Sequence, residues 1–233
     1  MMEIRKAGER GHAAFPALDS WHTFSFGDYY DAKQMGWGAL RVINDDTVQP
    51  GGGFPLHGHN NMEIISYVLD GALEHKDSMG SGSVIRPGNV QVMSAGTGVT
   101  HSEFNHSRTD PVHFLQIWIV PKFTGVSPSY QERFFEPSEK RGKLRLLASP
   151  DARDGSLKLW QDAYVHAALI DGDERVEYRV APERRLYVHI ARGEVSLCGQ
   201  TLSAGDGVKL RGKPTLTLTD GKDAEVLVFD LAE

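Results

Sequence analysis

The sequence predicts an all-β protein, and three observations support this. Short apolar runs recur along the 233 residues and are separated by turn residues. Gly, Asp, Asn and Pro occupy those separations, where glycine supplies positive φ and Asp or Asn bonds its own backbone. No segment carries a sustained 3.6-residue apolar stripe, so any helices should be short. A hydrophobic content of 40% predicts a packed core.

The first half contains five apolar runs that we interpret as strands. They are Trp21–Phe26, Ala39–Asn44, Met62–Leu69, Val90–Ser94 and His113–Val120. Turns follow several of them, as at Asp70-Gly71 and Pro87-Gly88. The run His113–Val120 is apolar on both faces except for His113 and Gln116, which is typical of a strand packed on both sides.

The composition then changes, with fewer β-branched residues, and we place a linker at 125–144 between domains at 1–124 and 145–233. Prolines and a charged run, Glu136–Lys143, mark this linker. After it come the predicted strands Leu157–Gln161, Ala163–Leu169, Arg185–Ala191, Glu194–Cys198 and Val226–Leu231. The alternation of strands and turns here, with a turn at Arg192-Gly193, resembles that of the first half. The second half has only His166 and His189, so if the halves are duplicates, only the first retains metal ligands.

Composition narrows the classes of function. A formal charge of −6 and a pI near 5.9 argue against nucleic acid as the main partner. The lone cysteine, Cys198, excludes an internal disulfide and fits a reducing compartment. No secretory signal follows Met1, and no apolar run is long enough for a transmembrane helix. We therefore expect a cytoplasmic protein without a membrane partner.

Two pairs of metal-capable residues, His57/His59 and His101/Glu103, form the candidate site. In a strand, side chains at i and i+2 point to the same face. If the two strands face each other, three imidazoles and a carboxylate converge, which suits a divalent first-row metal. Burying these groups without a cation would cost about 1–3 kcal/mol for each unpaired group. The pattern therefore predicts a catalytic metal site with open coordination positions.

Several other residues have a candidate role near this site. Glu63 and Asn105 match the strand parity of the histidines, so each could contact a metal ligand or face the substrate. For Asn105, capping of its strand is an equally good interpretation. The apolar residues that could line a cavity are Phe24, Phe26, Phe54, Met62, Met93 and Trp118. Five other histidines are interpreted as structural or solvent-facing, namely His22, His75, His106, His113 and His166.

The sequence resembles the cupin superfamily. The pattern Gly51-x5-His57-x-His59-x3-Glu63-x7-Gly71, followed by Gly98-x2-His101-x3-Asn105, is similar to the paired cupin motifs. Longer stretches resemble the pirin branch, namely Asp19–Phe26, Leu40–Asp46, His75–Gly80, Val92–Glu103 and Ser149–Ser156. This resemblance covers nearly all of residues 1–125 and, more loosely, the remainder.

The resemblance implies a bicupin, that is, two antiparallel β-barrels of the double-stranded β-helix or jelly-roll type. The N-terminal barrel would hold the metal and the C-terminal barrel would not. Many cupins take their carboxylate ligand from the first motif, here Glu63, whereas the pirin pattern takes it from the second, here Glu103. Spacing alone leaves both open, and the resemblance assigns His57, His59, His101 and Glu103.

The resemblance also implies quercetin 2,3-dioxygenase activity, in which dioxygen opens a flavonol ring and carbon monoxide is released. Glu103 would accept the proton of the flavonol hydroxyl. The cofactor would be one divalent transition metal, with iron expected first and nickel, copper, manganese, cobalt or zinc open. The substrates would be a small flavonol-like aromatic and dioxygen. One alternative is a regulatory pirin, in which the metal's redox state changes a surface that a protein partner recognises. Another is a metal-free or storage cupin.

Overall fold

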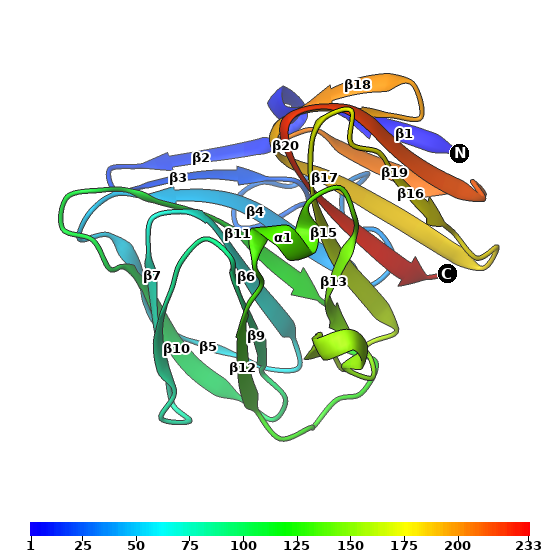
Figure 1. The fold of residues 1–233 in the computed structure, drawn as a ribbon. Helices are drawn as coiled ribbons and strands as arrows, with labels where there is room; N and C mark the ends of the chain where they lie inside the picture. The colour runs from blue at the N-terminus through cyan, green and yellow to red at the C-terminus, as the bar shows by residue number, and fades with distance from the viewer.

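The first half of the chain folds into two facing sheets (Figure 1). The computed structural model describes residues 1–233. A seven-stranded sheet has the order β12-β9-β6-β11-β4-β3-β2 and a four-stranded sheet the order β5-β10-β7-β8. The strands of the larger sheet are β2 (Gly11–Phe15), β3 (Leu18–His22), β4 (Leu40–Val48), β6 (Glu63–Asp70), β9 (Asn89–Ser94), β11 (Val112–Ile119) and β12 (Ser129–Phe134). Those of the smaller sheet are β5 (Gly53–His59), β7 (Leu73–Asp77), β8 (Gly82–Ile85) and β10 (Val99–Asn105).

The second half is built on one nine-stranded sheet. Its strands are β1 (Met2–Arg5), β13 (Arg145–Ser149), β14 (Leu157–Lys158), β15 (Ala163–Gly172), β16 (Val176–Arg179), β17 (Arg184–Leu197), β18 (Gln200–Ser203), β19 (Gly207–Arg211) and β20 (Thr215–Ala232). The helices are single turns, η1 (Ala7–Glu9), α1 (Pro137–Lys140) and η2 (Arg153–Gly155). The predicted all-β class with only short helices is confirmed. None of the helices is long and apolar enough to cross a membrane.

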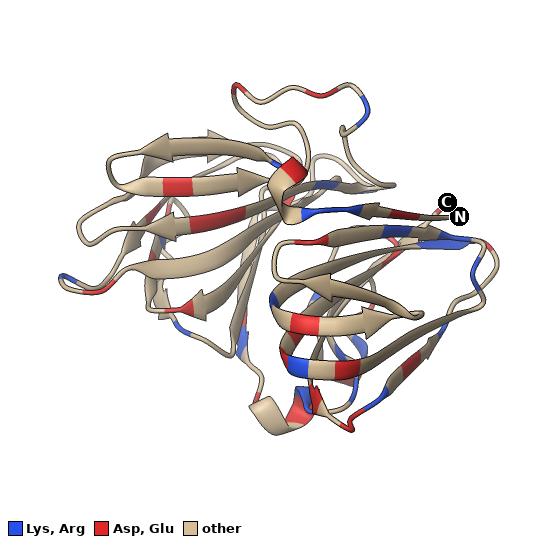
Figure 2. Cartoon of the chain, turned by 90° about the horizontal axis from the view of Figure 1, so that it is seen from above, with Lys and Arg blue, Asp and Glu red and all other residues tan.

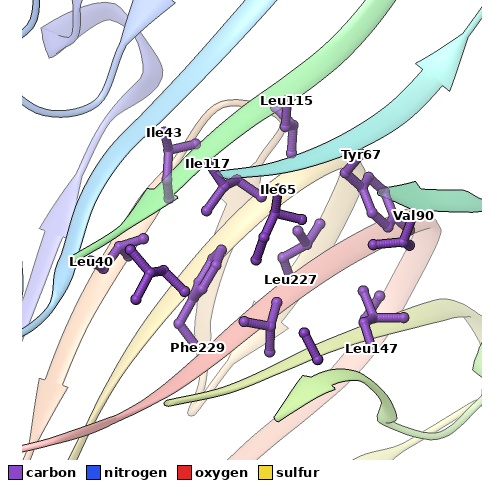
Figure 3. Close-up of a cluster of buried hydrophobic side chains, with 14 of the residues drawn as sticks. Leu40, Ile43, Ile65, Tyr67, Val90, Leu115, Ile117, Leu147, Leu227 and Phe229 are labelled. Carbon is purple, nitrogen blue, oxygen red and sulfur yellow. The ribbon is translucent and has the colours of Figure 1, made fainter. Parts of the chain in front are cut away.

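The strand β11 shows why its sequence is apolar on both faces. Alternate residues point to opposite sides of a sheet. Leu115, Ile117 and Ile119 face outward into a core of 24 buried residues contributed by both halves. Figure 3 shows this shared core, with Ile65 and Ile117 of the first half close to Leu227 and Phe229 of the second. The opposite face of β11 lines the interior of the first half, where the candidate site lies.

Two predicted boundaries differ from the structure. The predicted linker contains β12, which pairs with β9 of the first half, and the N-terminal β1 pairs with β19 of the second half. Each half therefore receives a strand from outside its predicted range. The predicted turn at Arg192-Gly193 is wrong, because β17 continues through it with irregular register against β20. A glycine with φ of 66° at position 193 marks a bulge there instead.

Charged residues are distributed over both halves. Basic and acidic positions are interspersed along the strands and loops in Figure 2. Many of them pair, as where Arg184 contacts Asp162 at 2.8 Å and Asp230 at 2.6 Å. The net negative charge is therefore spread over the surface and not concentrated on one sheet.

Candidate metal centre

The two candidate pairs lie on neighbouring strands of the small sheet. The strands β5 and β10 pair antiparallel with His57 directly opposite His101 and His59 opposite Val99. The register then shifts, so that Glu103 pairs with Phe54. A bulge of this kind bends a strand and changes the direction of its side chains. Gly53 permits the close approach of the strands here, because a Cβ at this position would lie 2.4 Å from the Glu103 carbonyl oxygen.

Three imidazole nitrogens converge at this point. The Nε2 atom of His101 lies 3.0 Å from Nε2 of His57 and 3.1 Å from Nε2 of His59. The other ring nitrogen of His57, Nδ1, donates to the Pro55 carbonyl at 2.7 Å. This hydrogen bond leaves the lone pair of His57 on Nε2, directed at the other two rings, which is how histidines that bind metals are commonly oriented.

The spacing of these nitrogens fits a bound cation. Metal–imidazole bonds are about 2.0–2.1 Å long. Two such ligands at a right angle, as in octahedral geometry, place their nitrogens about 3.0 Å apart, whereas a tetrahedral angle places them about 3.4 Å apart. The observed separations of 3.0 and 3.1 Å match the right-angled arrangement. The donor set therefore suits a first-row metal that accepts five or six ligands.

Burial keeps the imidazoles of His59 and His101 neutral. It lowers the pKa of His101 to about 3, with a further contribution from the neighbouring histidines, and lowers the pKa of His59 to about 4. A neutral ring offers a lone pair to a metal, whereas a protonated ring does not. Both residues are therefore ready to bind a cation at neutral pH without first losing a proton.

Glu103 lies beside this cluster with a different set of neighbours. Its carboxyl accepts a hydrogen bond from Gln116 Nε2 at 2.7 Å and lies 3.3 Å from the Ser66 hydroxyl. Its closest metal-capable neighbours are His75 and His101, and it does not converge with His57 and His59 as tightly as the three imidazoles converge with each other. Burial raises its pKa to about 7. The group can thus exchange a proton near neutral pH.

His75 lies near the site, although the sequence interpretation took it as structural or solvent-facing. It is fully buried, its Nε2 lies 2.7 Å from the Asp77 carboxylate, and its ring centre is 5.4 Å from that of His101. The ring also stacks on Tyr130 at 4.8 Å. The pattern His75-x-Asp77 has the same spacing as the two recognised pairs, and this was the signal available in the sequence.

A polar row crosses the inner face of the large sheet beneath these residues. Cross-strand pairing aligns five polar side chains in register, one from each of five adjacent strands: His22, Asn44, Gln116, Ser66 and Gln91. Gln116 and Ser66, in the middle of this row, contact the carboxyl of Glu103. The row ends beside His75, whose Nδ1 lies 3.3 Å from the Gln91 amide.

A cavity of about 500 Å³ opens in front of the histidines. The lining includes His57, His59 and Glu103, and the aromatic side chains of Phe26, Phe54 and Trp118. Trp118 packs edge-on against His59 at 5.1 Å and against Phe26 at 5.4 Å. A pocket of this size, mostly apolar with a few polar groups, is typical of a small-molecule site.

The other three predicted cavity residues lie elsewhere. Phe24 belongs to the core shared by the two halves. Met93 is buried in a small cluster beside the site, and Met62 packs against that cluster. His22, by contrast, was interpreted as structural but lines the cavity.

Two further predictions need correction. Glu63 lies on the opposite face of β6, where it accepts a hydrogen bond from Ser94 at 2.6 Å near Trp160 of the second half. The strand parity predicted from His57 and His59 does not reach Glu63, because β5 ends at His59 and Asn61 turns the chain with φ of 45°. Burial raises the pKa of Glu63 to about 7.

Asn105 joins loops and does not contact the histidines. Its amide nitrogen donates to the carbonyls of Val48 at 2.9 Å and Asp110 at 2.8 Å, and its oxygen accepts from the Ser107 backbone at 2.8 Å. These three bonds use its capacity at the end of β10. Of the two roles that the sequence left open, the structure therefore favours strand capping.

Comparisons with known proteins agree with this architecture. The family model for pirin matches residues 3–119, and the model described as the quercetinase C-terminal cupin domain matches residues 146–231. A quercetin 2,3-dioxygenase of Escherichia coli K12 is 47% identical over 231 residues, which are 99% of both chains. A pirin-like protein of Caulobacter vibrioides is 39% identical over the full length of both chains.

Solved structures show the same fold. The crystal structure of YhhW from Escherichia coli has a TM-score of 0.95 and 46% identity, and it covers 99% of this chain and 97% of that one. A second structure, of the bacterial pirin YhhW in complex with nickel(II), has a TM-score of 0.94 and 46% identity over 100% of this chain and 99% of that one. The predicted bicupin architecture is confirmed by these matches.

Proposed function

The chain belongs to the pirin family, and we propose that it is a metal-dependent dioxygenase of the quercetin 2,3-dioxygenase type. It would open the ring of a flavonol with dioxygen and release carbon monoxide. The observation that carries this proposal is the convergence of three imidazole Nε2 atoms, 3.0 and 3.1 Å apart, at one wall of an aromatic-lined cavity. The naming of a full-length relative as a quercetin 2,3-dioxygenase supports it.

His57, His59, His101 and Glu103 would hold the metal. The bound cation would supply Lewis acidity, which lowers the pKa of a substrate hydroxyl, and open positions for small ligands. The His57–Pro55 hydrogen bond fixes the ring that faces the cavity. The remaining chemistry depends on residues that the chain itself positions around the substrate.

Glu103 would accept the proton of the flavonol hydroxyl. Its pKa of about 7 divides it between charged and neutral forms near neutral pH, which suits a general base. The hydrogen bond from Gln116 keeps one carboxyl oxygen in place. Ser66 has one hydroxyl proton, and its oxygen lies closer to Gln116, at 3.0 Å, than to Glu103, at 3.3 Å. The hydrogen bond from Ser66 to Glu103 is therefore the weaker of the two and the more easily broken.

The aromatic residues would bind the flat rings of the substrate. Phe26 and Trp118 meet edge to face at 5.4 Å and line the cavity together. With a substrate bound, they would exclude water from the region in front of Glu103, which strengthens electrostatic interactions there. A regulatory pirin would not require a cavity of this size, and for this reason we favour the enzyme over the sensor.

The metal is one divalent transition ion. A relative binds nickel(II), and among the candidates we propose iron first, since histidine and carboxylate ligands with open positions are the set used by non-haem iron oxygenases. The location that we propose is the cytoplasm, where the lone exposed Cys198 would remain reduced.

The test is dioxygen uptake with quercetin by chelated protein that has been reloaded with each metal in turn. We expect uptake and carbon monoxide release with at least one metal and none with the chelated protein. Turnover below about 0.01 per second with every metal would contradict the proposal, since the enzyme median is about 10 per second.

A further inference from the structure

We propose that Tyr29 determines substrate specificity by contacting the part of the substrate that lies remote from the metal ligands, and that Arg5 and Gly11 are positioning residues that hold its ring there. This inference rests on the proposed function, because a flavonol carries rings beyond the one that binds the metal. Tyr29 lines the same cavity as His57 and Glu103. Its place in that cavity follows from the glycine against which it packs.

Gly11 shows that the Tyr29 ring lies on the cavity face of the large sheet. Gly11 of β2 is the cross-strand partner of His22, so it extends the polar row by one strand. Residues directly opposite each other on neighbouring strands point to the same face of a sheet. A Cβ atom on Gly11 would point to that face, where it would lie 2.2 Å from Cγ of Tyr29. The Tyr29 ring therefore occupies the space that a side chain at position 11 would fill.

The row also places Tyr29 far from the metal ligands. Gln116, which donates to Glu103 at 2.7 Å, lies three strands from Gly11 along this row. Neighbouring strands are about 4.8 Å apart, so the two positions are separated by about 14 Å. A single ring held at the metal ligands is too short to reach Tyr29, whereas a flavonol has further rings that extend beyond the metal.

Arg5 holds the Tyr29 ring by its hydroxyl group. Nη2 of Arg5 donates to Oη of Tyr29 at 2.6 Å and to the Glu9 carbonyl at 2.8 Å. Nη1 of Arg5 donates to the Thr23 carbonyl. These bonds orient the planar guanidinium group. The backbone of Tyr29 exchanges two hydrogen bonds of 3.0 Å with Phe26, so the residue is fixed both at its backbone and at its hydroxyl.

The strand that carries Arg5 is anchored in the second half of the molecule. Arg5 is the last residue of β1, and it pairs with Gly207 of β19. The side chain of Arg5 is buried, and it runs from this pairing to the wall of the cavity in the first half. The second half therefore helps to position an aromatic ring that a substrate in the first half would contact.

The test compares quercetin with maltol, which keeps the hydroxy-ketone ring that binds a metal but lacks both aromatic rings of a flavonol. Isothermal titration calorimetry under nitrogen on nickel-loaded protein measures both affinities without turnover. We expect the wild type to bind quercetin at least about tenfold more tightly than maltol, because only quercetin reaches the wall at Tyr29. Equal affinity for the two ligands would overturn the proposal.

Gly11→Ala tests the position of the ring. The added methyl group would lie 2.2–2.6 Å from Cγ and both Cδ atoms of Tyr29, so the ring has to move. We expect a loss of about tenfold in quercetin affinity and an unchanged affinity for maltol. Gly8→Ala is the matched control, since a Cβ atom at Gly8 has nothing within 4 Å. Equal losses for the two ligands in Gly11→Ala would indicate a general disturbance of the site and contradict the specific role of Tyr29.

Substitutions of Tyr29 keep the test decisive if Gly11→Ala does not fold. Tyr29→Ala should lose about tenfold in affinity for quercetin only, and Tyr29→Phe, which removes only the bond to Arg5, should lose about threefold. In the double variant the methyl group at position 11 meets no ring, so its quercetin affinity should equal that of Tyr29→Ala alone. Thermal melting and nickel content verify that each variant is folded. Wild-type quercetin affinity in Tyr29→Ala would refute the contact.

Dioxygen uptake distinguishes the role of Tyr29 from the proposed function. If no metal supports uptake but Tyr29→Ala still weakens quercetin binding, the enzyme is refuted and Tyr29 remains a specificity-determining residue for ligand binding. If uptake occurs and Tyr29→Ala binds quercetin as the wild type does, the enzyme remains and the role of Tyr29 is refuted.

Discussion

The two halves of the molecule have related β architecture but use their interiors differently. The second half is filled by a cluster of 16 buried aliphatic residues. The first half holds only clusters of six and four, and in their place it has the cavity and the polar row. Asp230 of the second half is bonded by Tyr178 at 2.5 Å and by Arg184 at 2.6 Å, and buried atoms without partners occur in both halves, as at His22 in the first and His189 in the second.

The difference teaches how such a fold makes room for a ligand. Aliphatic side chains in the interior stabilise a domain by about 25 cal/mol for each Å² of apolar surface buried, and a cavity forgoes that stabilisation. The first half recovers it from the shared core of 24 residues, which packs the outer face of its large sheet against the second half. The second half therefore acts as a support for the half that carries the site.

The largest expected effect separates the histidines of the two halves. His101→Ala should reduce nickel or iron affinity by about a hundredfold or more and abolish quercetin turnover, because it removes the nitrogen at the centre of the three-histidine cluster. His166→Ala, the matched control in the second half, should leave both intact. Metal analysis after dialysis and dioxygen uptake measure the two effects. Equal losses in the two variants would break the comparison.

Glu103→Gln should reduce turnover by about a hundredfold, which is typical for loss of a general base, while metal content falls by less than tenfold. The amide is nearly isosteric with the carboxyl but cannot accept a proton. Single-turnover rates on protein of known metal content separate the two quantities. If rate and metal content fall in parallel, Glu103 acts only as a ligand.

Core substitutions test whether the second half provides the stability. Leu218→Ala in the aliphatic cluster should lower the free energy of unfolding by about 2–5 kcal/mol. Phe26→Leu on the cavity wall should cost less, about 1.5 kcal/mol or below, because one side of that ring already faces open space. Urea unfolding measures both. A larger cost at Phe26 would show that the cavity wall is as tightly packed as the filled interior.

A pH-dependent effect concerns His189 of β17 in the second half, which is buried with neither ring nitrogen bonded. Burial lowers its pKa to about 4, whereas an unfolded histidine titrates near about 6.5. Below that value the unfolded chain takes up a proton that the folded chain refuses. This contribution to stability is therefore intact above about pH 6.5 and is lost as the pH falls toward 4, by about 2 kcal/mol at pH 5.

Urea unfolding of the wild type and of His189→Met at pH 7.5 and pH 5 isolates this contribution. The difference in unfolding free energy between the two proteins should shift in favour of the variant by about 2 kcal/mol at the lower pH. Other titrating groups, including the carboxyls of Glu63 and Glu103, cancel in that comparison because both proteins contain them. An identical pH dependence in the two proteins would mean that His189 is protonated in the folded state.

The sequence by itself determined the all-β class and singled out the three histidines that the structure brings together. Both follow from local rules, since strand parity at His57/His59 and His101/Glu103 needs only two residues of spacing. The family motifs added the bicupin architecture. The prediction from strand parity was wrong for Glu63 because the chain turns at Asn61. A count of residues assumes one continuous strand and cannot detect a turn between two strands.

Only the tertiary structure decided which residues join the site from other strands. His22 and Asn44 become neighbours of Gln116 through cross-strand register, and His75 comes to lie beside His101 in the same way. Register depends on side chains far apart in the sequence and on bulges such as the one after His101. The three histidines could be predicted because their spacing within each strand is local. The cavity around them could not be predicted, because its walls come from strands that are distant in the sequence.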